Sequence, residues 1–190
     1  MMNRHTPIKK ARQGRYLIAE PMLLDQSFNR TVVLLTEYNE EGFVGFVLNK
    51  PMDLYIHELV PELPESDFPV FFGGPVQNDS IFYVHTLGSR VSGSLHIAGD
   101  LYWGGDFDEL KALMHSGSVN PQEIRFFMGY SGWSPRQLEG ELEEKSWVVL
   151  EAGSIDPLND APGTMWKKVL LHLGDDYKIW ANAPKDPMLN

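Results

Sequence analysis

Short apolar segments, separated by glycine, proline and polar residues, dominate the first hundred positions of this chain. The segments are rich in Val, Leu, Ile and aromatic residues, and this composition is typical of β-strands. The pattern predicts strands over residues 16–19, 31–36, 43–48, 70–72, 80–86, 94–98, 101–103, 124–130 and 147–150. Because few helices separate these strands, an α+β fold with a mixed, mainly antiparallel sheet is expected.

Apolar residues at helical spacing predict four helices. A short helix is expected from Asp53 to Val60, and longer ones after Asp106 and from Pro162 to Leu173, the last closed by Gly174. The fourth begins near Ser134. This serine can cap the helix, Pro135 fits its first position, and Gln137 completes a Ser-x-x-Gln capping box.

The strand over 124–130 and the helix after Ser134 form the unit on which the rest of the chain is organised. Gly129 and Gly132 bracket the turn between them, at positions where a side chain would obstruct a neighbour. Trp133 closes this turn, and we expect it to be a buried anchor.

Four stretches of the sequence resemble the bacterial YqgE/AlgH family. They read Gly-Tyr-Ser-Gly-Trp with Gln-Leu-Glu-Gly-Glu-Leu (129–142), Gly-Phe-Val-Gly-Phe-Val-Leu-Asn-Lys-Pro (42–51), Phe-Gly-Gly-Pro-Val (72–76) and the run over 14–30. The chain departs from the family pattern at Arg136, where the family usually has glycine. The resemblance implies that the sheet curls partly into a small barrel with helices outside, and it implies a role in regulating transcription.

The length of 190 residues fits one domain. We expect a flexible basic arm over 1–13, a single domain over 14–180 and a frayed tail over 181–190. No apolar run is long enough for a membrane span, and the N-terminus lacks the apolar segment of a signal peptide. A cytoplasmic location is therefore expected, and the oligomeric state is left open.

Charge is distributed unevenly along the chain. Residues 1–15 contain five basic side chains and no acidic one, whereas the rest carries 11 basic and 26 acidic residues, a net charge of −15. Such an acidic body repels the phosphate backbone, so direct nucleic-acid binding is not expected. The absence of cysteine excludes disulfides, thiolate catalysis and cysteine-ligated zinc.

Catalytic and cofactor motifs are incomplete. A nucleophile elbow at Ser131 would need glycine where the chain has Trp133, and a zinc-protease helix at His57 would need histidine where it has Pro61. The histidines show no metal-ligand spacing, and there is no phosphate-binding glycine loop. Neither a metal nor a cofactor is expected.

One group of polar residues is a candidate site, because its members lie at the ends of predicted strands or beside the central turn. Its members are Arg30, Asn49, Lys50, Gly73, Gly74, Tyr130 and Gln137. If the sheet brings them together, they would form a cleft for a small anion or a peptide. The alternative is internal: Arg30 would pair with an acid, and Asn49 would cap its own turn.

The sequence therefore predicts a non-enzymatic binding protein that regulates transcription indirectly, through a protein partner or a small anionic ligand. The alternative is a small-molecule hydrolase or transferase that uses a cleft near Tyr130, Ser131 and Arg30. Direct DNA binding through the basic arm is the weakest of the three hypotheses.

Overall fold

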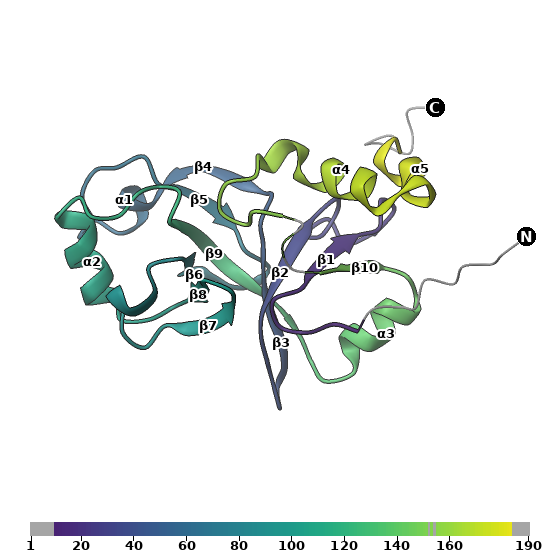
Figure 1. Ribbon diagram of the computed structural model, residues 1–190, viewed down its shortest axis with the longest axis horizontal. Coiled ribbons are helices and arrows are strands. Elements are labelled where there is room, and N and C mark those ends of the chain that lie inside the picture. Colours follow the sequence, from purple (N-terminus) through teal and green to yellow (C-terminus); the bar gives the residue numbers. More distant parts are fainter. Residues whose placement is uncertain (1–9, 152, 154, 184–190) are drawn as a thin grey trace, which may run out of the picture.

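The computed structural model describes residues 10–151, 153 and 155–183 (Figure 1). These residues form a ten-stranded sheet. Its strands are β1 (Tyr16–Ala19), β2 (Val32–Asn39), β3 (Gly42–Val47), β4 (Pro51–Tyr55), β5 (Pro69–Phe72), β6 (Val76–His85), β7 (Leu95–Ala98), β8 (Leu101–Trp103), β9 (Ile124–Trp133) and β10 (Trp147–Leu150). The helices are α1 (Ile56–Leu59), α2 (Phe107–His115), α3 (Gln137–Glu143), α4 (Pro162–Leu173) and α5 (Lys178–Ala181). Short 3-10 helices cover Gly88–Arg90 and Asp175–Tyr177.

The long strand β9 connects the two parts of the sheet. Along its first half it pairs with β6 on one side and with β5 on the other, and at its end it pairs with β3. The order along the main path is β10-β1-β2-β3-β9-β6-β8-β7. Among the pairings of the described strands, β5 with β9 is parallel and the others are antiparallel. The expected mixed, mainly antiparallel α+β fold is confirmed.

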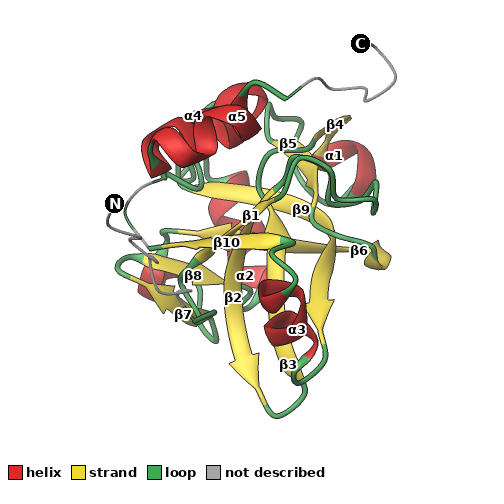
Figure 2. Ribbon diagram, turned by 90° about the vertical axis from the view of Figure 1, so that its right-hand side faces the viewer, coloured by secondary structure: helices red, strands yellow, loops and turns green. Residues whose placement is uncertain are grey.

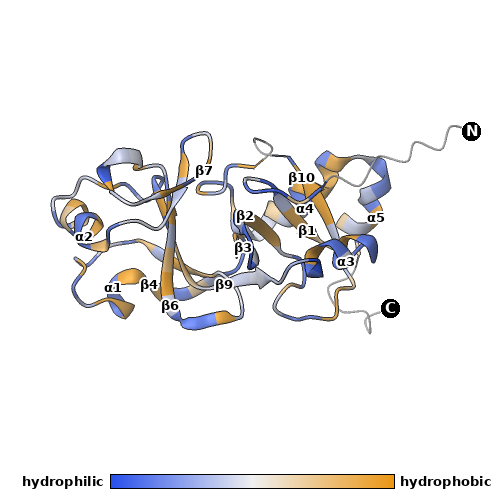
Figure 3. Ribbon diagram, turned by 90° about the horizontal axis from the view of Figure 1, so that it is seen from below, coloured by the Kyte–Doolittle hydropathy of each residue, from blue (hydrophilic) through white to orange (hydrophobic). Residues whose placement is uncertain are grey.

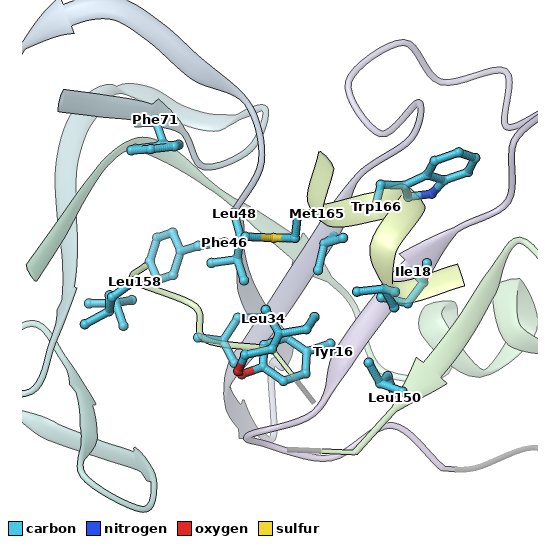
Figure 4. Close-up of a cluster of buried hydrophobic side chains, with 14 of the residues drawn as sticks. Tyr16, Ile18, Leu34, Phe46, Leu48, Phe71, Leu150, Leu158, Met165 and Trp166 are labelled. Carbon is cyan, nitrogen blue, oxygen red and sulfur yellow. The ribbon is translucent and has the colours of Figure 1, made fainter. Parts of the chain in front are cut away.

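The strand β1 and the adjoining halves of β2 and β3 are buried on both faces, between α4 on one side and α3 on the other (Figure 2), and successive residues alternate between two cores. Tyr16, Ile18 and Leu34 face a core that α4 covers with Met165 and Trp166 (Figure 4). Leu17, Val33 and Leu35 face the opposite core, which is covered by Leu138 and Leu142 of α3. Burying each such side chain stabilises the fold by about 1.5–3 kcal/mol.

A third core lies at the far end of the sheet, where β5, β6 and β9 pack against α1 and α2 (Figure 1, left). Ile56 of α1 and Leu110 of α2 are completely buried there, beside Phe126 of β9. The same long strand therefore contributes to the cores at both ends of the molecule.

The sheet curls but does not close into a barrel. The edge strand β7 meets the residues that precede β1: the side-chain Nε2 of Gln13 donates to His96 O over 2.6 Å, and Gly14 packs on Ala98. A side chain and a glycine therefore cover this edge, where a paired strand would be needed for closure.

Three local predictions were wrong. Asp53 lies in β4 and not at a helix start, because pairing with β5 overrides the local capping signal. Strand β9 continues through Gly129 and Gly132 to Trp133. Helix α3 begins at Gln137, since Arg136 takes a left-handed conformation with φ of 69° and ends the turn before the helix.

Of the arm expected over 1–13 and the tail expected over 181–190, residues 1–9 and 184–190 lie outside the described ranges, and Ala181 is the last residue of α5. None of the helices formed by the described residues combines the length and the apolarity needed to span a bilayer.

Candidate functional site

Arg30 ends the turn that precedes β2, and its side chain reaches the C-terminal helices. Its Nη2 donates to Ala183 O over 2.6 Å, and its guanidinium lies 4.8 Å from the ring centroid of Trp166. Trp166 in turn donates from Nε1 to Ala19 O in β1. Arg30 thus joins the turn to α4 and to the segment after α5.

Asn49 and Lys50 hold the same turn from the other side. Asn49 uses both ends of its amide, since Oδ1 accepts from Val32 N and Nδ2 donates to Arg30 O, each over 2.9 Å. The ammonium of Lys50 donates to Gln26 O over 2.8 Å and to Ser27 O over 2.9 Å. Burial lowers the pKa of Lys50, against a smaller opposing effect of Asp25. Asn49 therefore has an internal role, but it holds the turn before β2 and does not cap its own turn as foreseen.

Gly73 and Gly74 lie where the chain crosses the backbone of β9. A Cβ on Gly73 would collide with Gly129 O, and one on Gly74 would collide with the carbonyl of Tyr130. The ring of Tyr130 packs edge-on against Phe82, with 5.6 Å between ring centroids. The two glycines therefore permit a close backbone crossing.

Gln137 lies at the start of α3. Its Oε1 accepts from Ser134 N over 3.1 Å, and its Nε2 donates to Glu141 Oε1 over 2.9 Å. The expected reach of Gln137 back to Ser134 is thus present, although Ser134 lies outside the helix.

The seven candidate residues fall into three groups: the turn before β2, the glycine crossing and the start of α3. Backbone hydrogen bonds connect the first two groups, from Phe72 N to Lys50 O and from Val47 N to Gly73 O, each over 2.9 Å. Four surface hollows of the described residues are lined by other side chains. A ligand-binding role of the seven residues stays a prediction.

Ser131 is completely buried, and its hydroxyl donates to Gly73 O over 3.0 Å. In buried His85, Nδ1 accepts a hydrogen bond from Leu87 N. The ring proton is therefore on Nε2, which donates to Gly104 O over 2.9 Å. Burial lowers the pKa of His85. Both side chains therefore make hydrogen bonds of a structural kind. Within the described ranges, no three His, Asp or Glu side chains are placed to hold a metal ion.

The sequence analysis missed an aromatic cluster around Glu141. The carboxylate Oε2 accepts from the indole Nε1 of both Trp133, over 2.8 Å, and Trp147, over 2.7 Å. Phe28 packs against both indoles, with ring centroids 5.9 and 5.4 Å away. Two tryptophans that flank an acidic helix were the only signal of this arrangement in the sequence.

Arg125 was also missed, because its neighbours in β9 are apolar. It is 6% exposed and donates to Leu48 O over 2.9 Å and to Leu158 O over 2.7 Å, with its guanidinium 4.3 Å from the ring centroid of Phe71. Burial lowers the pKa of Arg125 to about 10, and Asp156 and Asp160 oppose this shift. The residue fastens the segment before α4 to the central strand.

A hollow of about 600 Å³ lies over that segment. Two of the aspartates that line it have partners: Asp156 accepts from the backbone N–H groups of Leu158 and Asn159, and Asp160 accepts from Lys168. The carboxylates of Asp156 and Asp160 are therefore engaged in local hydrogen bonds.

A second hollow, of about 690 Å³, separates the tip of the β2–β3 hairpin from α3, and we call it the hairpin–helix groove. Tyr38 and Phe43 of the hairpin form one part of its lining, and Glu139, Leu142 and Glu143 of α3 form another. The backbone segment 10–13 completes it. The rings of Tyr38 and Phe43 stack with 4.3 Å between centroids, and Tyr38 is 61% exposed. The groove therefore offers an aromatic surface to solvent beside a charged helix.

The sequence and the fold both match known proteins. A UPF0301 protein of Chlorobium limicola is 42% identical over 181 residues, which cover 95% of this chain and 97% of that protein. A UPF0301 protein of Cytophaga hutchinsonii is 45% identical over 179 residues, with coverage of 94% and 98%.

The solution structure of the AlgH protein from Pseudomonas aeruginosa superposes with a TM-score of 0.71 at 28% identity, covering 93% of this chain and 98% of that one. The crystal structure of a protein from Corynebacterium diphtheriae gives the same TM-score at 23% identity, which supports the fold alone. The model of the AlgH-like family matches residues 16–178. The chain therefore belongs to the AlgH-like family.

Proposed function

We propose that this protein acts by binding a protein partner rather than by catalysis, and that it influences transcription indirectly through that partner. The observation that carries the proposal is the hairpin–helix groove. Its stacked pair, Tyr38 and Phe43, is partly exposed, and exposed aromatic groups in a concave surface are typical of protein-binding sites.

The positions of the polar candidates support a non-catalytic role. The hydroxyl of Ser131 is buried and donates to a backbone carbonyl, and the amide of Asn49 is fully used within the fold. A nucleophile needs a neighbouring base and access to substrate. The regulatory part of the proposal rests on the role in transcription that the resemblance to the YqgE/AlgH family implies.

A peptide selection tests the proposal directly. Random twelve-residue peptides are displayed and selected on the full-length protein, and the enriched peptides are measured against two variants. We expect Tyr38→Asp, in the groove, to lose most of the binding. We expect Tyr55→Asp, which changes a tyrosine that is 45% exposed in β4, to retain it.

Enrichment of peptides that bind both variants equally would place the binding surface elsewhere and contradict the proposal. The regulatory part has its own measurement. Transcript profiles of cells carrying Tyr38→Asp should follow those of cells without the protein, whereas cells carrying Tyr55→Asp should resemble the wild type.

A further inference from the structure

Carboxylates lie on one wall of the hairpin–helix groove and in the hairpin turn beside it. Glu139 and Glu143 are exposed on its helical wall, and the hairpin turn between Tyr38 and Phe43 carries the exposed Glu40 and Glu41. In Figure 3, hydrophilic residues colour much of the α3 ribbon blue. Carboxylates gathered at a concave surface focus a negative potential that attracts cationic groups.

The opposite wall is formed by residues 10–13, which contribute Lys10 and Arg12. The lining therefore holds two carboxylates and two cations, and Glu40 and Glu41 of the adjoining hairpin turn add two exposed carboxylates beside it. The net charge of the whole chain, which includes these residues, is −10. The electrostatic preference of the site is for a positively charged partner.

The apolar part of the groove defines the second requirement. The stacked rings of Tyr38 and Phe43 offer contacts for large apolar groups, and Leu142, which is buried in the core, forms the floor beside them. The volume of about 690 Å³ lies in the range of pockets that hold one compact ligand, so it accommodates a few side chains and not a folded domain.

We propose that the hairpin–helix groove binds a basic segment of another protein, in which one or two large apolar side chains are flanked by lysine or arginine. This inference rests on the proposed function and adds the chemical class of the partner. The apolar side chains would contact the aromatic pair, and the flanking cations would lie against Glu139, Glu143 and the hairpin carboxylates. Nucleic acid does not fit, because the same carboxylates repel phosphate.

Three fluorescein-labelled peptides serve as probes in an anisotropy titration with the full-length protein. Each has two central leucines, flanked on both sides by two lysines, two serines or two glutamates. We expect the lysine peptide to bind best, and we expect its affinity to fall as salt is raised, because exposed charges are screened.

Two double variants separate the local effect from the net charge. Glu139→Lys with Glu143→Lys should weaken the lysine peptide by roughly tenfold, since two attractive pairs become repulsive. Glu65→Lys with Asp79→Lys makes the same change in net charge on exposed residues of other elements, and it should change the affinity by less than about twofold. Unchanged thermal midpoints would establish that both variants fold.

The outcomes distinguish the inference from the proposed function. If the serine or glutamate peptide binds the groove as tightly as the lysine peptide, the basic partner is wrong while binding through the groove stands. If none of the three binds, or if Glu139→Lys with Glu143→Lys has no effect, the inference is likewise overturned. Light scattering adds a further outcome: a dimer that this double variant dissociates would assign the groove to a second copy of the chain and contradict a foreign partner.

Discussion

Four non-glycine residues of the described chain have positive φ angles, and Arg136 is one of them, with φ of 69° directly before α3. A side chain in this region costs about 1–2 kcal/mol, while glycine is permitted there. We therefore expect Arg136→Gly to raise the free energy of unfolding by about 0.5–1 kcal/mol, because relief of strain outweighs the added freedom of the unfolded chain. Urea unfolding measures the change.

The control for this variant is Glu139→Gly, at an exposed position inside α3. It should destabilise the protein by about 1 kcal/mol, the usual cost of glycine in a helix. If both variants lose stability, the conformation of Arg136 is not strained.

Glu141 accepts the hydrogen bonds of two indoles, those of Trp133 and Trp147. Removing the carboxylate with Glu141→Ala leaves two largely buried donors unsatisfied, and each costs about 1–3 kcal/mol. We expect a lower thermal midpoint and a changed tryptophan emission. Glu143→Ala, two residues later on the exposed side of α3, should stay within about 0.5 kcal/mol of the wild type. Equal midpoints for the two variants would show that the indoles find other acceptors.

Tyr16 gives the fold a dependence on alkaline pH. Burial, together with the charges of Asp156 and Asp160, raises the pKa of its phenol to about 12. In the unfolded chain the phenol loses its proton near pH 10. Between pH 10 and pH 12 the folded state therefore keeps a proton that the unfolded state has lost, and its stability relative to the unfolded state falls as the pH rises. The shifted pKa of Tyr16 contributes about 2–3 kcal/mol to the free energy of unfolding. This contribution is complete below pH 10 and is lost as the pH rises through 12.

Tyr16→Phe should therefore lose less stability than the wild type between pH 10 and pH 12, as measured by urea unfolding. Tyr38→Phe, on an exposed ring, should decline as the wild type does. A decline in Tyr16→Phe as steep as that of the wild type would assign the alkaline sensitivity to other groups.

At the scale of elements, the crossing of the Gly73–Gly74 turn over β9 decides how the two parts of the sheet meet. Gly73→Ala should be strongly destabilising, by more than about 2 kcal/mol, because the new Cβ would collide with Gly129 O and the sheet would have to separate there. Gly140→Ala should have the opposite effect. No atom lies within 4 Å of its Cβ position, and alanine in α3 gains about 0.5–1 kcal/mol.

Thermal unfolding of the two alanine variants provides the comparison. Equal midpoints would mean that the crossing adjusts without cost. A drop confined to Gly73→Ala would support the close contact between β5 and β9 as a fixed feature of the fold.

At the scale of the whole molecule, the charge distribution governs what the protein can approach. The net charge of −10 predicts weak DNA association, with a dissociation constant in the non-specific range of about 10⁻⁴–10⁻⁶ M and a steep salt dependence. Replacing Arg4, Lys9, Lys10 and Arg12 by glutamine should abolish even this binding in an anisotropy assay. Sequence-specific binding that survives these four replacements would overturn the indirect role in transcription.

Local pattern was sufficient for most elements. The continuous apolar run Tyr16–Ala19 predicts a short strand, and the helical stripe of Pro162–Leu173 predicts α4 with its boundaries. These signals work because each depends only on residues a few positions away. The two predicted helix starts that were wrong have a different cause. At Asp53, pairing of β4 with β5 outweighs the local capping signal. Before α3, the left-handed φ angle of Arg136 moves the helix start from Ser134 to Gln137.

The amino-acid sequence by itself thus determined the fold class, the acidic surface and the family to which the chain belongs. Only the tertiary structure decided which polar groups bond to one another and where the surface is hollow. Asn49 makes hydrogen bonds with Val32 and Arg30. Tyr38 and Glu139, about a hundred positions apart in the chain, line the same groove. The physical reason is that a strand or helix follows from neighbours in sequence, whereas a hydrogen bond or a cavity follows from distances between segments that the sequence keeps far apart.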